Sequence, residues 1–265
     1  MRFKDKVAIV TGGGQGIGKA IALAFAAEGA TVVVAARTKA NLEKTVKEIT
    51  AKGGTALARP TDITKEAEVE GLVAETVKAY GKIDILVNNS GIGGPTVMVP
   101  DLSLDDWNQV LAVDLTGSML CSKHVLRHMM PKKSGVIINI GAEGGRAGDG
   151  RSGYPRRSPY CCAKMGIIGL TETLSVEMGP FNIRVNCVSP AAVKGERIIS
   201  VMTARAKAEG VSFDEMWKNL TANYSLGRIT EESDVAAICL FLASDEARSI
   251  TGQTIVCHSG HHAVM

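Results

Sequence analysis

The sequence predicts an α/β fold with a parallel sheet of seven strands covered by helices on both faces, formed as one doubly wound domain over residues 1–265. Two observations predict it. Strand-like and helix-like patterns alternate from end to end, and alternation of this kind is typical of a parallel sheet with helical crossovers. No linker, repeat or low-complexity segment interrupts the alternation, so a second domain is not expected.

The first unit is the most informative one. Residues 7–10 form an apolar run, residues 11–18 read Thr-Gly-Gly-Gly-Gln-Gly-Ile-Gly, and residues 19–28 have a helical pattern. A glycine-rich turn between a strand and a helix directs free backbone N–H groups and the positive end of the helix toward a pyrophosphate. A surface turn that is merely rich in glycine is the alternative, but this placement favours a dinucleotide site in a Rossmann-like fold.

Six further strands follow from short apolar runs, at residues 31–36, 55–59, 83–87, 136–140, 183–188 and 254–257. Helices are expected at residues 39–52, 64–80, 103–130, 158–178 and 231–243, and residues 197–220 are irregular to helical. Helical spacing of Leu42, Val46 and Ile49 supports the first of these. Thr64 is a candidate N-cap for the second, and Pro131 ends the third.

Composition excludes several classes of function. The chain has 30 basic and 27 acidic residues, a balance that disfavours nucleic-acid binding. No apolar run is long enough to cross a membrane. The six cysteines are scattered through apolar stretches and are interpreted as reduced core residues of a cytoplasmic protein. His258, His261 and His262 follow Cys257 without a carboxylate at ligand spacing, so no metal site is predicted.

Tyr160 and Lys164 are the strongest candidates for catalysis. Residues four apart on a helix share a face, so the phenol and the ammonium group should lie side by side. The ordinary pKa of tyrosine is about 10. A neighbouring cation favours the phenolate and lowers that pKa. Such a pair can give a proton to a carbonyl oxygen or take one from a carbinol.

Several ordered segments resemble the single-domain branch of the short-chain dehydrogenase/reductase family over nearly the whole chain. They are the glycine loop at residues 11–18, Asn-Asn-Ser-Gly at 88–91, the pair Tyr160 and Lys164, the segment at 182–190, and Ile-Thr-Gly-Gln at 250–253.

The resemblance implies roles for individual residues. Tyr160 would be the general acid and base, and Lys164 would lower its pKa and hold the nicotinamide ribose. Asp114 stands where the family usually has an asparagine of the proton relay. Asn88 would brace the cofactor loop, and Asp62 would accept a hydrogen bond from the adenine amino group. The implied cofactor contacts are Gly12, Gln15, Gly16, Ile17, Gly18, Arg37, Asp62, Ile63, Asn88, Tyr160, Lys164, Pro190 and Val193.

The chain departs from the family pattern around the reaction centre. Ala142 replaces the second serine that usually binds the substrate oxygen, and a missing donor of this kind costs about 10²–10³ in rate. Ser158 and Tyr154 are candidate substitutes, and the sequence does not choose between them. Asp114 replaces an asparagine, and Ala191 replaces a glycine after Pro190.

Charges near the expected active-site mouth indicate the ligands. Strand 31–36 ends in Ala36 where NAD-specific folds usually have an acid, and Arg37 can pair with a 2′-phosphate. NADP is therefore the expected cofactor, with NAD possible. Between Ala142 and Tyr160 lie four arginines with one aspartate, Asp149, and a substrate lid is expected at 191–223. These charges favour an anionic substrate such as a keto acid, a sugar acid or an acyl thioester. The arginines are Arg146, Arg151, Arg156 and Arg157, and the lid adds Lys194 and Arg197.

Two functions remain open at this stage. The first is an oxidoreductase that interconverts a ketone and a secondary alcohol, active as a homotetramer or homodimer. The alternative is a dinucleotide-binding protein with little catalysis, because the usual serine is Ala142.

Overall fold

The computed structural model describes residues 1–142 and 153–261, and it confirms the predicted α/β architecture. Seven parallel strands form one sheet in the order β3-β2-β1-β4-β5-β6-β9. This order reverses direction beside β1, which is the arrangement of a doubly wound dinucleotide-binding sheet. The strands are β1 (Val7–Thr11), β2 (Thr31–Ala36), β3 (Thr55–Pro60), β4 (Ile85–Asn88), β5 (Gly135–Ile140), β6 (Ile183–Pro190) and β9 (Thr254–Cys257).

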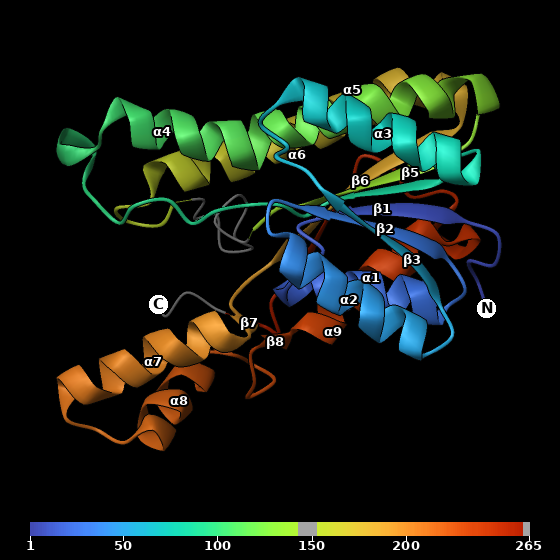
Figure 1. The fold of residues 1–265 in the computed structure, drawn as a ribbon. Helices are drawn as coiled ribbons and strands as arrows, with labels where there is room; N and C mark the ends of the chain where they lie inside the picture. Colours follow the sequence, from blue (N-terminus) through green and yellow to red (C-terminus); the bar gives the residue numbers. More distant parts are fainter. Residues whose placement is uncertain (143–152, 262–265) are drawn as a thin grey trace.

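Helices cover both faces of this sheet (Figure 1). One layer contains α1 (Gly16–Ala27), α2 (Lys39–Ala51) and α9 (Glu232–Ala243), and the other contains α3 (Glu66–Tyr80), α5 (Gly117–Met129) and α6 (Ser158–Met178). Successive side chains of a strand point to opposite faces of the sheet. In β1, Ala8 and Val10 pack in the core under α1 and α9, and Ile9 packs in the core under α3 and α5. The central strands β1, β4 and β5 are buried along their whole length, which explains their continuous apolar runs.

Several element boundaries differ from the sequence expectation. The helix expected at residues 64–80 begins at Glu66, and its N-cap is Lys65 rather than Thr64. The helix expected at 103–130 is interrupted: α4 (Leu104–Leu111) passes through a π-helical turn at Ala112–Thr116 into α5. Ser103 caps α4, accepting from the Asp106 N–H at 3.1 Å. The sequence predicts one continuous helix here, and the structure corrects this prediction.

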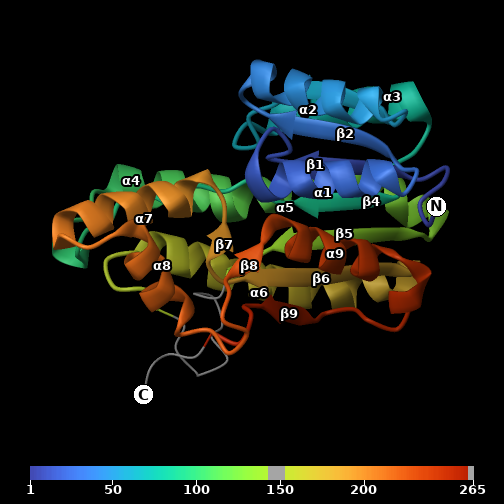
Figure 2. The same cartoon turned by 90° about the horizontal axis from the view of Figure 1, so that it is seen from below.

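The segment after β6 forms two helices rather than one irregular stretch. A short parallel ribbon of β7 (Val193–Lys194) and β8 (Thr230–Glu231) connects α7 (Glu196–Glu209) and α8 (Phe213–Thr221) to the main sheet. The two helices share a small core of their own around Met202, Ala206 and Met216. Figures 1 and 2 both show α7 and α8 on the side where the sheet strands end.

Candidate active site

The glycine loop between β1 and α1 is held by close backbone packing. The Gly12 N–H donates to the Ala35 carbonyl at 2.7 Å. A Cβ atom at Gly18 would overlap the Gly12 carbonyl oxygen and the Asn89 amide nitrogen. At Gly16, φ is +55° and the space beside the Cα is open, with Glu232 Oε1 3.7 Å from a built Cβ. The loop is therefore closed on its protein side and open at the start of α1, a cradle that fits a dinucleotide pyrophosphate.

The Asn-Asn pair after β4 has two different roles. Thr11 Oγ1 accepts from the backbone N–H of Asn89 at 2.9 Å and of Ser90 at 3.1 Å, and Asn89 Nδ2 donates to the Thr11 carbonyl at 2.9 Å. The Asn89 side chain thus contacts the glycine loop. Asn88 points instead into the core between strands. The residue that contacts the loop directly is therefore Asn89, whereas the resemblance implied its neighbour Asn88.

A buried polar network lies beneath the strand ends, and the sequence analysis did not anticipate it. Asn88 Nδ2 lies 2.9 Å from Asn139 Oδ1 and 3.0 Å from Ser122 Oγ, and Asn139 Nδ2 donates to Thr171 Oγ1 at 2.9 Å. These groups join β4, β5, α5 and α6. The one visible signal was a polar Asn139 within the apolar run of β5. The network fixes α6, which carries Tyr160, relative to the strands under the cofactor loop.

The adenosine end of the candidate site lies where β2 and β3 end. Asp62 Oδ1 accepts from the Thr64 N–H at 3.1 Å and the Thr64 hydroxyl at 2.7 Å. Burial acts to raise the pKa of Asp62, but these hydrogen bonds and the charges of Lys65 and Arg37 lower it overall. Arg37 is exposed, and no ion pair within the described ranges engages it. The Ile63 side chain is buried.

Tyr160, Lys164 and Asp114 lie together at the carboxyl edge of the sheet, as the spacing predicted for the first two. Lys164 Nζ lies 5.7 Å from the Tyr160 ring centroid and donates to the Ile140 carbonyl at 3.1 Å. Asp114 Oδ2 lies 3.5 Å from the same Nζ atom. Both charged residues are buried, with exposed fractions of 5% for Lys164 and 1% for Asp114. The arrangement places a cation beside a phenol that can exchange a proton with a ligand.

The π-helical turn explains how Asp114 reaches this place. It lies at the centre of the turn, and its Oδ1 accepts from the Ile92 N–H at 2.7 Å. Turns of this kind occur often at functional sites. Burial raises the pKa of the Asp114 carboxyl, while the Lys164 charge, the Ile92 hydrogen bond and the Arg157 charge act in the opposite direction.

The surroundings of Ala142 contain three candidate donors, one of which is the unpartnered Ser189 Oγ, 3.1 Å from a Cβ built on Gly141. Ala142 is buried and has no hydrogen-bonding side-chain atom. Ser158 Oγ and Arg157 Nε are both buried without a hydrogen-bond partner among the described residues. The Arg157 guanidinium carbon lies 5.1 Å from the Tyr160 ring centroid. Tyr154 is 41% exposed, and its backbone N–H donates to Cys161 Sγ at 3.2 Å. Arg146, Asp149 and Arg151 lie outside the described residues.

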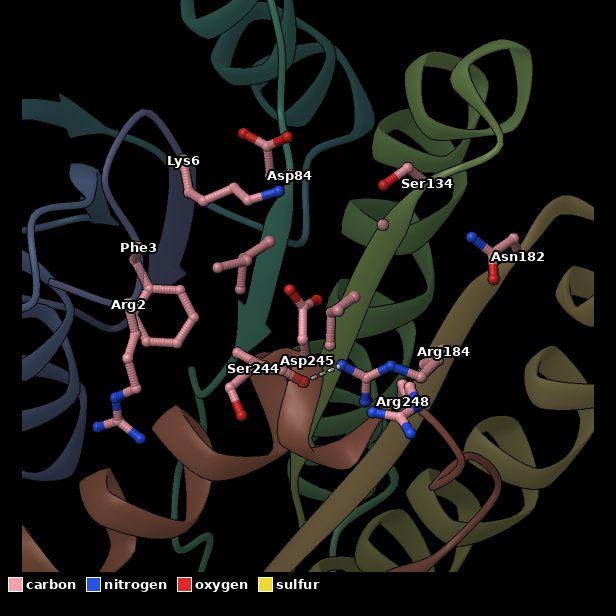
Figure 3. A pocket seen from close by; sticks show the side chains of 14 residues that line it. Arg2, Phe3, Lys6, Asp84, Ser134, Asn182, Arg184, Ser244, Asp245 and Arg248 are labelled. Carbon is pink, nitrogen blue, oxygen red and sulfur yellow. Dashed lines mark hydrogen bonds between the residues drawn. The ribbon is translucent and has the colours of Figure 1, made fainter.

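A cavity of about 150 Å³ lies at the opposite edge of the sheet, where the strands begin (Figure 3). It is smaller than typical ligand pockets of roughly 300–1,000 Å³. Arg184 lines it, donating to the Leu242 carbonyl at 2.6 Å and to the Ser244 carbonyl at 3.0 Å, as Figure 3 shows for Ser244. This arginine joins β6 to the end of α9, and we assign the cavity a structural role.

The cysteines, the potential metal ligands and the apolar helices were also the subject of predictions from the sequence. All six cysteines are free, but Cys162 is exposed rather than in the core. Within residues 1–142 and 153–261 no group of three potential ligands could hold a metal ion. In the same ranges, none of the helices combines the length and the apolar character needed to span a membrane. Pro190 ends β6, and Val193 lies in β7.

Comparisons with known proteins cover almost the entire chain. A family model described as enoyl-(acyl carrier protein) reductase matches residues 12–262. The chain is 38% identical over 260 residues to a short-chain dehydrogenase/reductase of Armillaria gallica, covering 97% of this chain and 96% of that one. It is 35% identical over 258 residues to a subunit of a hydroxy(phenyl)methylsuccinyl-CoA dehydrogenase of Thauera aromatica, covering 97% of each chain.

A solved structure shows the same agreement in three dimensions. The crystal structure of an NAD⁺-bound xylitol dehydrogenase superposes with a TM-score of 0.89 at 30% identity, covering 98% of this chain and 100% of that one. At this identity and coverage, the likeness extends to the whole sheet and both helical layers.

Proposed function

The chain belongs to the short-chain dehydrogenase/reductase family, and from that premise we propose that it interconverts a ketone and a secondary alcohol with NADP(H), on a substrate that carries negative charge. The family assignment makes it an NAD(P)-dependent oxidoreductase acting on CH–OH groups. The observation that carries the proposal is the Tyr160–Lys164 pair, placed at the carboxyl edge of the sheet that also bears the glycine loop.

The proposed chemistry follows from these side chains. When bound, the nicotinamide would supply or accept a hydride at the substrate carbon. Tyr160 would give its phenolic proton to the ketone oxygen in reduction, and as phenolate would take the hydroxyl proton in oxidation. The Lys164 cation, with its Nζ 5.7 Å from the Tyr160 ring centroid, would stabilise negative charge on the phenol oxygen during this exchange. Asp114 would hold the lysine in place, at 3.5 Å.

The preference for NADP rests on the end of β2. Ala36 offers no carboxylate to the ribose 2′-hydroxyl, and the exposed Arg37 is free to pair with a 2′-phosphate. Gly12, Gln15, Gly16, Ile17 and Gly18 would hold the pyrophosphate. Asp62 and the Ile63 backbone would contact adenine, and Pro190 and Val193 would bound the nicotinamide half. Asn88 would support the cofactor loop beside the adenosine indirectly, through the buried network under the strands. The NAD⁺ in the similar xylitol dehydrogenase makes a direct comparison of the two cofactors the necessary test.

An anionic substrate is proposed from the charges around the mouth. Arg156 and Arg157 precede α6, and Lys194 lies in β7 at the start of the proposed lid, residues 191–223. The sequence between Ala142 and Tyr160 contains Glu143 as well as Asp149, so it has four arginines and two carboxylates rather than one, and its net charge is positive. The Thauera relative, named for an acyl-CoA substrate, supports an acyl thioester as the first candidate.

An oligomer is also proposed, as a homotetramer or homodimer. Helices α5 and α6 leave apolar side chains exposed, with 37% for Met119, 42% for Met165 and 78% for Val176. An isologous contact between two copies would cover them. Light scattering at micromolar protein concentration tests this, and a monomer would contradict it.

The function is tested by following cofactor absorbance with panels of neutral ketones, keto acids, sugar acids and acyl thioesters, each with both cofactors. We expect turnover with at least one anionic substrate, a higher kcat/KM with NADPH than with NADH, and a KM that rises with salt. Faster turnover of neutral ketones than of every anionic substrate would contradict the substrate class.

The alternative function has one observation in its favour. Ala142 removes a donor that the family uses, which is compatible with a dinucleotide-binding protein that catalyses little. The retained Tyr160–Lys164 pair argues against it, since binding alone does not need both groups. Tight cofactor binding by calorimetry together with no turnover across the panel would favour this alternative.

A further inference from the structure

Two changes around Tyr160 would each weaken catalysis if nothing offset them. Ala142 offers no hydrogen-bond donor to a substrate oxygen. Asp114 places a carboxylate 3.5 Å from Lys164 Nζ, where a neutral amide would leave the lysine charge unopposed. A negative charge there works against the phenolate that the lysine favours. A single additional cation with free N–H groups beside Tyr160 would offset both changes.

Arg157 is such a cation. It is the N-cap residue of α6, and its guanidinium carbon lies 5.1 Å from the Tyr160 ring centroid. Residues 157, 160 and 164 are three and four positions apart, so Arg157, Tyr160 and Lys164 occupy one face of the helix. Ser158 and Ser189 also carry unpartnered hydroxyls near Ala142. Ser158 is two positions from Tyr160 and belongs to a different face of the helix, and Ser189 lies on β6 rather than on the helix that carries Tyr160.

The hydrogen bonding of Arg157 indicates a missing ligand. Its Nε is buried and has no partner among the described residues. A buried guanidinium N–H without an acceptor is costly, so such a group calls for an explanation. An oxygen atom of a bound substrate in front of Tyr160 would supply the acceptor. The Arg157 charge also reaches Asp114, where it acts to lower the carboxyl pKa.

We propose that Arg157 is a catalytic residue that donates a hydrogen bond to the reacting oxygen in place of the hydroxyl absent at Ala142, and that its charge offsets Asp114. This rests on the proposed function. In reduction, a hydride from the nicotinamide bonds to the carbonyl carbon, the carbonyl π electrons move to oxygen, and that oxygen takes the Tyr160 proton. The ketone gains two electrons and the nicotinamide loses two. Arg157 stays protonated throughout and transfers no proton.

The first test compares Arg157→Gln with Arg127→Gln. Arg127 is an exposed arginine in the last turn of α5, so its variant removes the same charge from outside the site. We expect Arg157→Gln to lower kcat about 10²-fold and to leave the cofactor Kd within about twofold. The Arg127 control should keep kcat within about threefold. Equal kcat values for the two variants would overturn the proposal.

The second test asks whether a hydroxyl at position 142 replaces the arginine. Ala142→Ser should restore kcat about tenfold in the Arg157→Gln background and change the wild type much less, a coupling that a double-mutant cycle measures. No rescue in a folded Arg157→Gln protein overturns the donor role. If Arg157→Gln instead lowers both the melting temperature and the affinity for the cofactor, the contact of Arg157 with the Tyr160 ring is structural and the proposal fails. Arg157→Lys, which keeps the charge, should be less impaired than Arg157→Gln.

The third test does not depend on turnover. Binding of acetate, an unreactive carboxylate, to the cofactor-loaded protein is measured by calorimetry in the wild type, Arg157→Gln and Arg127→Gln. Arg157→Gln should weaken acetate binding about tenfold, because a charge-assisted donor is lost, and Arg127→Gln should leave it unchanged. Equal acetate affinities in all three proteins would overturn the role of Arg157 even if no substrate were ever found. An inactive wild type that binds acetate through Arg157 would refute the proposed function alone.

Discussion

The cofactor end and the reaction end of the same sheet edge are built by different means. At the glycine loop, the backbone itself is the binding surface, and Gly18 has no room for a Cβ atom beside Gly12 and Asn89. At the reaction end, charged side chains on α6 and on the π-helical turn form the site, and the backbone around Tyr160 is a regular α-helix. The first end is fixed by shape and the second by charge. Substitutions at the first should therefore alter folding and binding, and those at the second should alter turnover.

The largest effect should come from Tyr160→Phe. Removal of the phenolic proton should lower kcat about 10³-fold, within the usual range for general acid–base groups, while the cofactor Kd and the melting temperature stay close to wild type. Steady-state kinetics and calorimetry measure this separation. Tyr80→Phe, at the end of α3, is the matched control and should be active. More than a tenth of wild-type activity in Tyr160→Phe would refute the mechanism.

A smaller but broader effect should follow from Gly18→Ala. The added methyl group overlaps backbone and the Asn89 amide, so about 1–3 kcal/mol of folding free energy should be lost, with weaker cofactor binding. Chemical denaturation and cofactor titration measure both. Gly71→Ala in α3 is the control, because its Cβ would meet Arg59 Nη2 at 3.8 Å, an ordinary contact. If Gly18→Ala lowered kcat alone, the distinction between the two ends would be lost.

Arg37→Gln should sharpen the description of the cofactor end. Loss of a charge-assisted contact to the 2′-phosphate should reduce kcat/KM for NADP about tenfold or more and leave that for NAD nearly unchanged. The comparison of both cofactors in one variant is its own control, and Lys52→Gln, at the C-cap of α2, shows the effect of charge alone. Equal losses with both cofactors would place Arg37 outside the 2′-phosphate site.

The smallest effect concerns two aspartates with opposite pH dependence. Burial raises the pKa of the Asp114 carboxyl above its ordinary value of 3.8. The stability of the wild type relative to Asp114→Asn should therefore fall as the pH rises from 3.8 through the raised pKa.

A backbone hydrogen bond from Glu231 and the Arg228 side chain lower the pKa of Asp234 at the start of α9. Its stabilisation should be present above pH 3.8 and disappear below it. Denaturation across acidic pH measures both slopes, and slopes of the same sign would contradict this.

Much of the fold was predictable because each unit carries its own signal. The apolar runs of the seven strands and the glycine loop are visible in the local sequence, and the alternation of strands with helices predicts that the sheet is parallel. The start of α3 at Glu66 was missed because the Thr64 hydroxyl bonds to Asp62 instead of capping the helix. The helices α7 and α8 were missed as separate elements because their apolar residues face each other rather than the sheet.

The candidate site was predictable where it depends on spacing along one helix. Tyr160 and Lys164 share a face of α6, and the sequence alone indicates that. The contacts of Asn139 with Asn88 and Thr171 depend on how β4, β5 and α6 pack, which no local pattern encodes. Arg157 was grouped with the charged loop, because it precedes the helix expected at 158–178, and the direction of an N-cap side chain depends on how the chain enters the helix.

The π-helical turn at Ala112–Thr116 gives the α4–α5 rod a phase shift. Each residue of an α-helix advances its face by about 100°. One additional residue within the turn therefore sets the side chains of α4 and α5 out of phase, although the two helices continue along one course. Deletion of a single residue there would restore the regular α-helical hydrogen-bond pattern and turn Asp114 away from Lys164. It would also rotate every side chain of α4 about the common axis of the two helices. The alignment of the reaction centre thus depends on chain length within five residues, as well as on their identity.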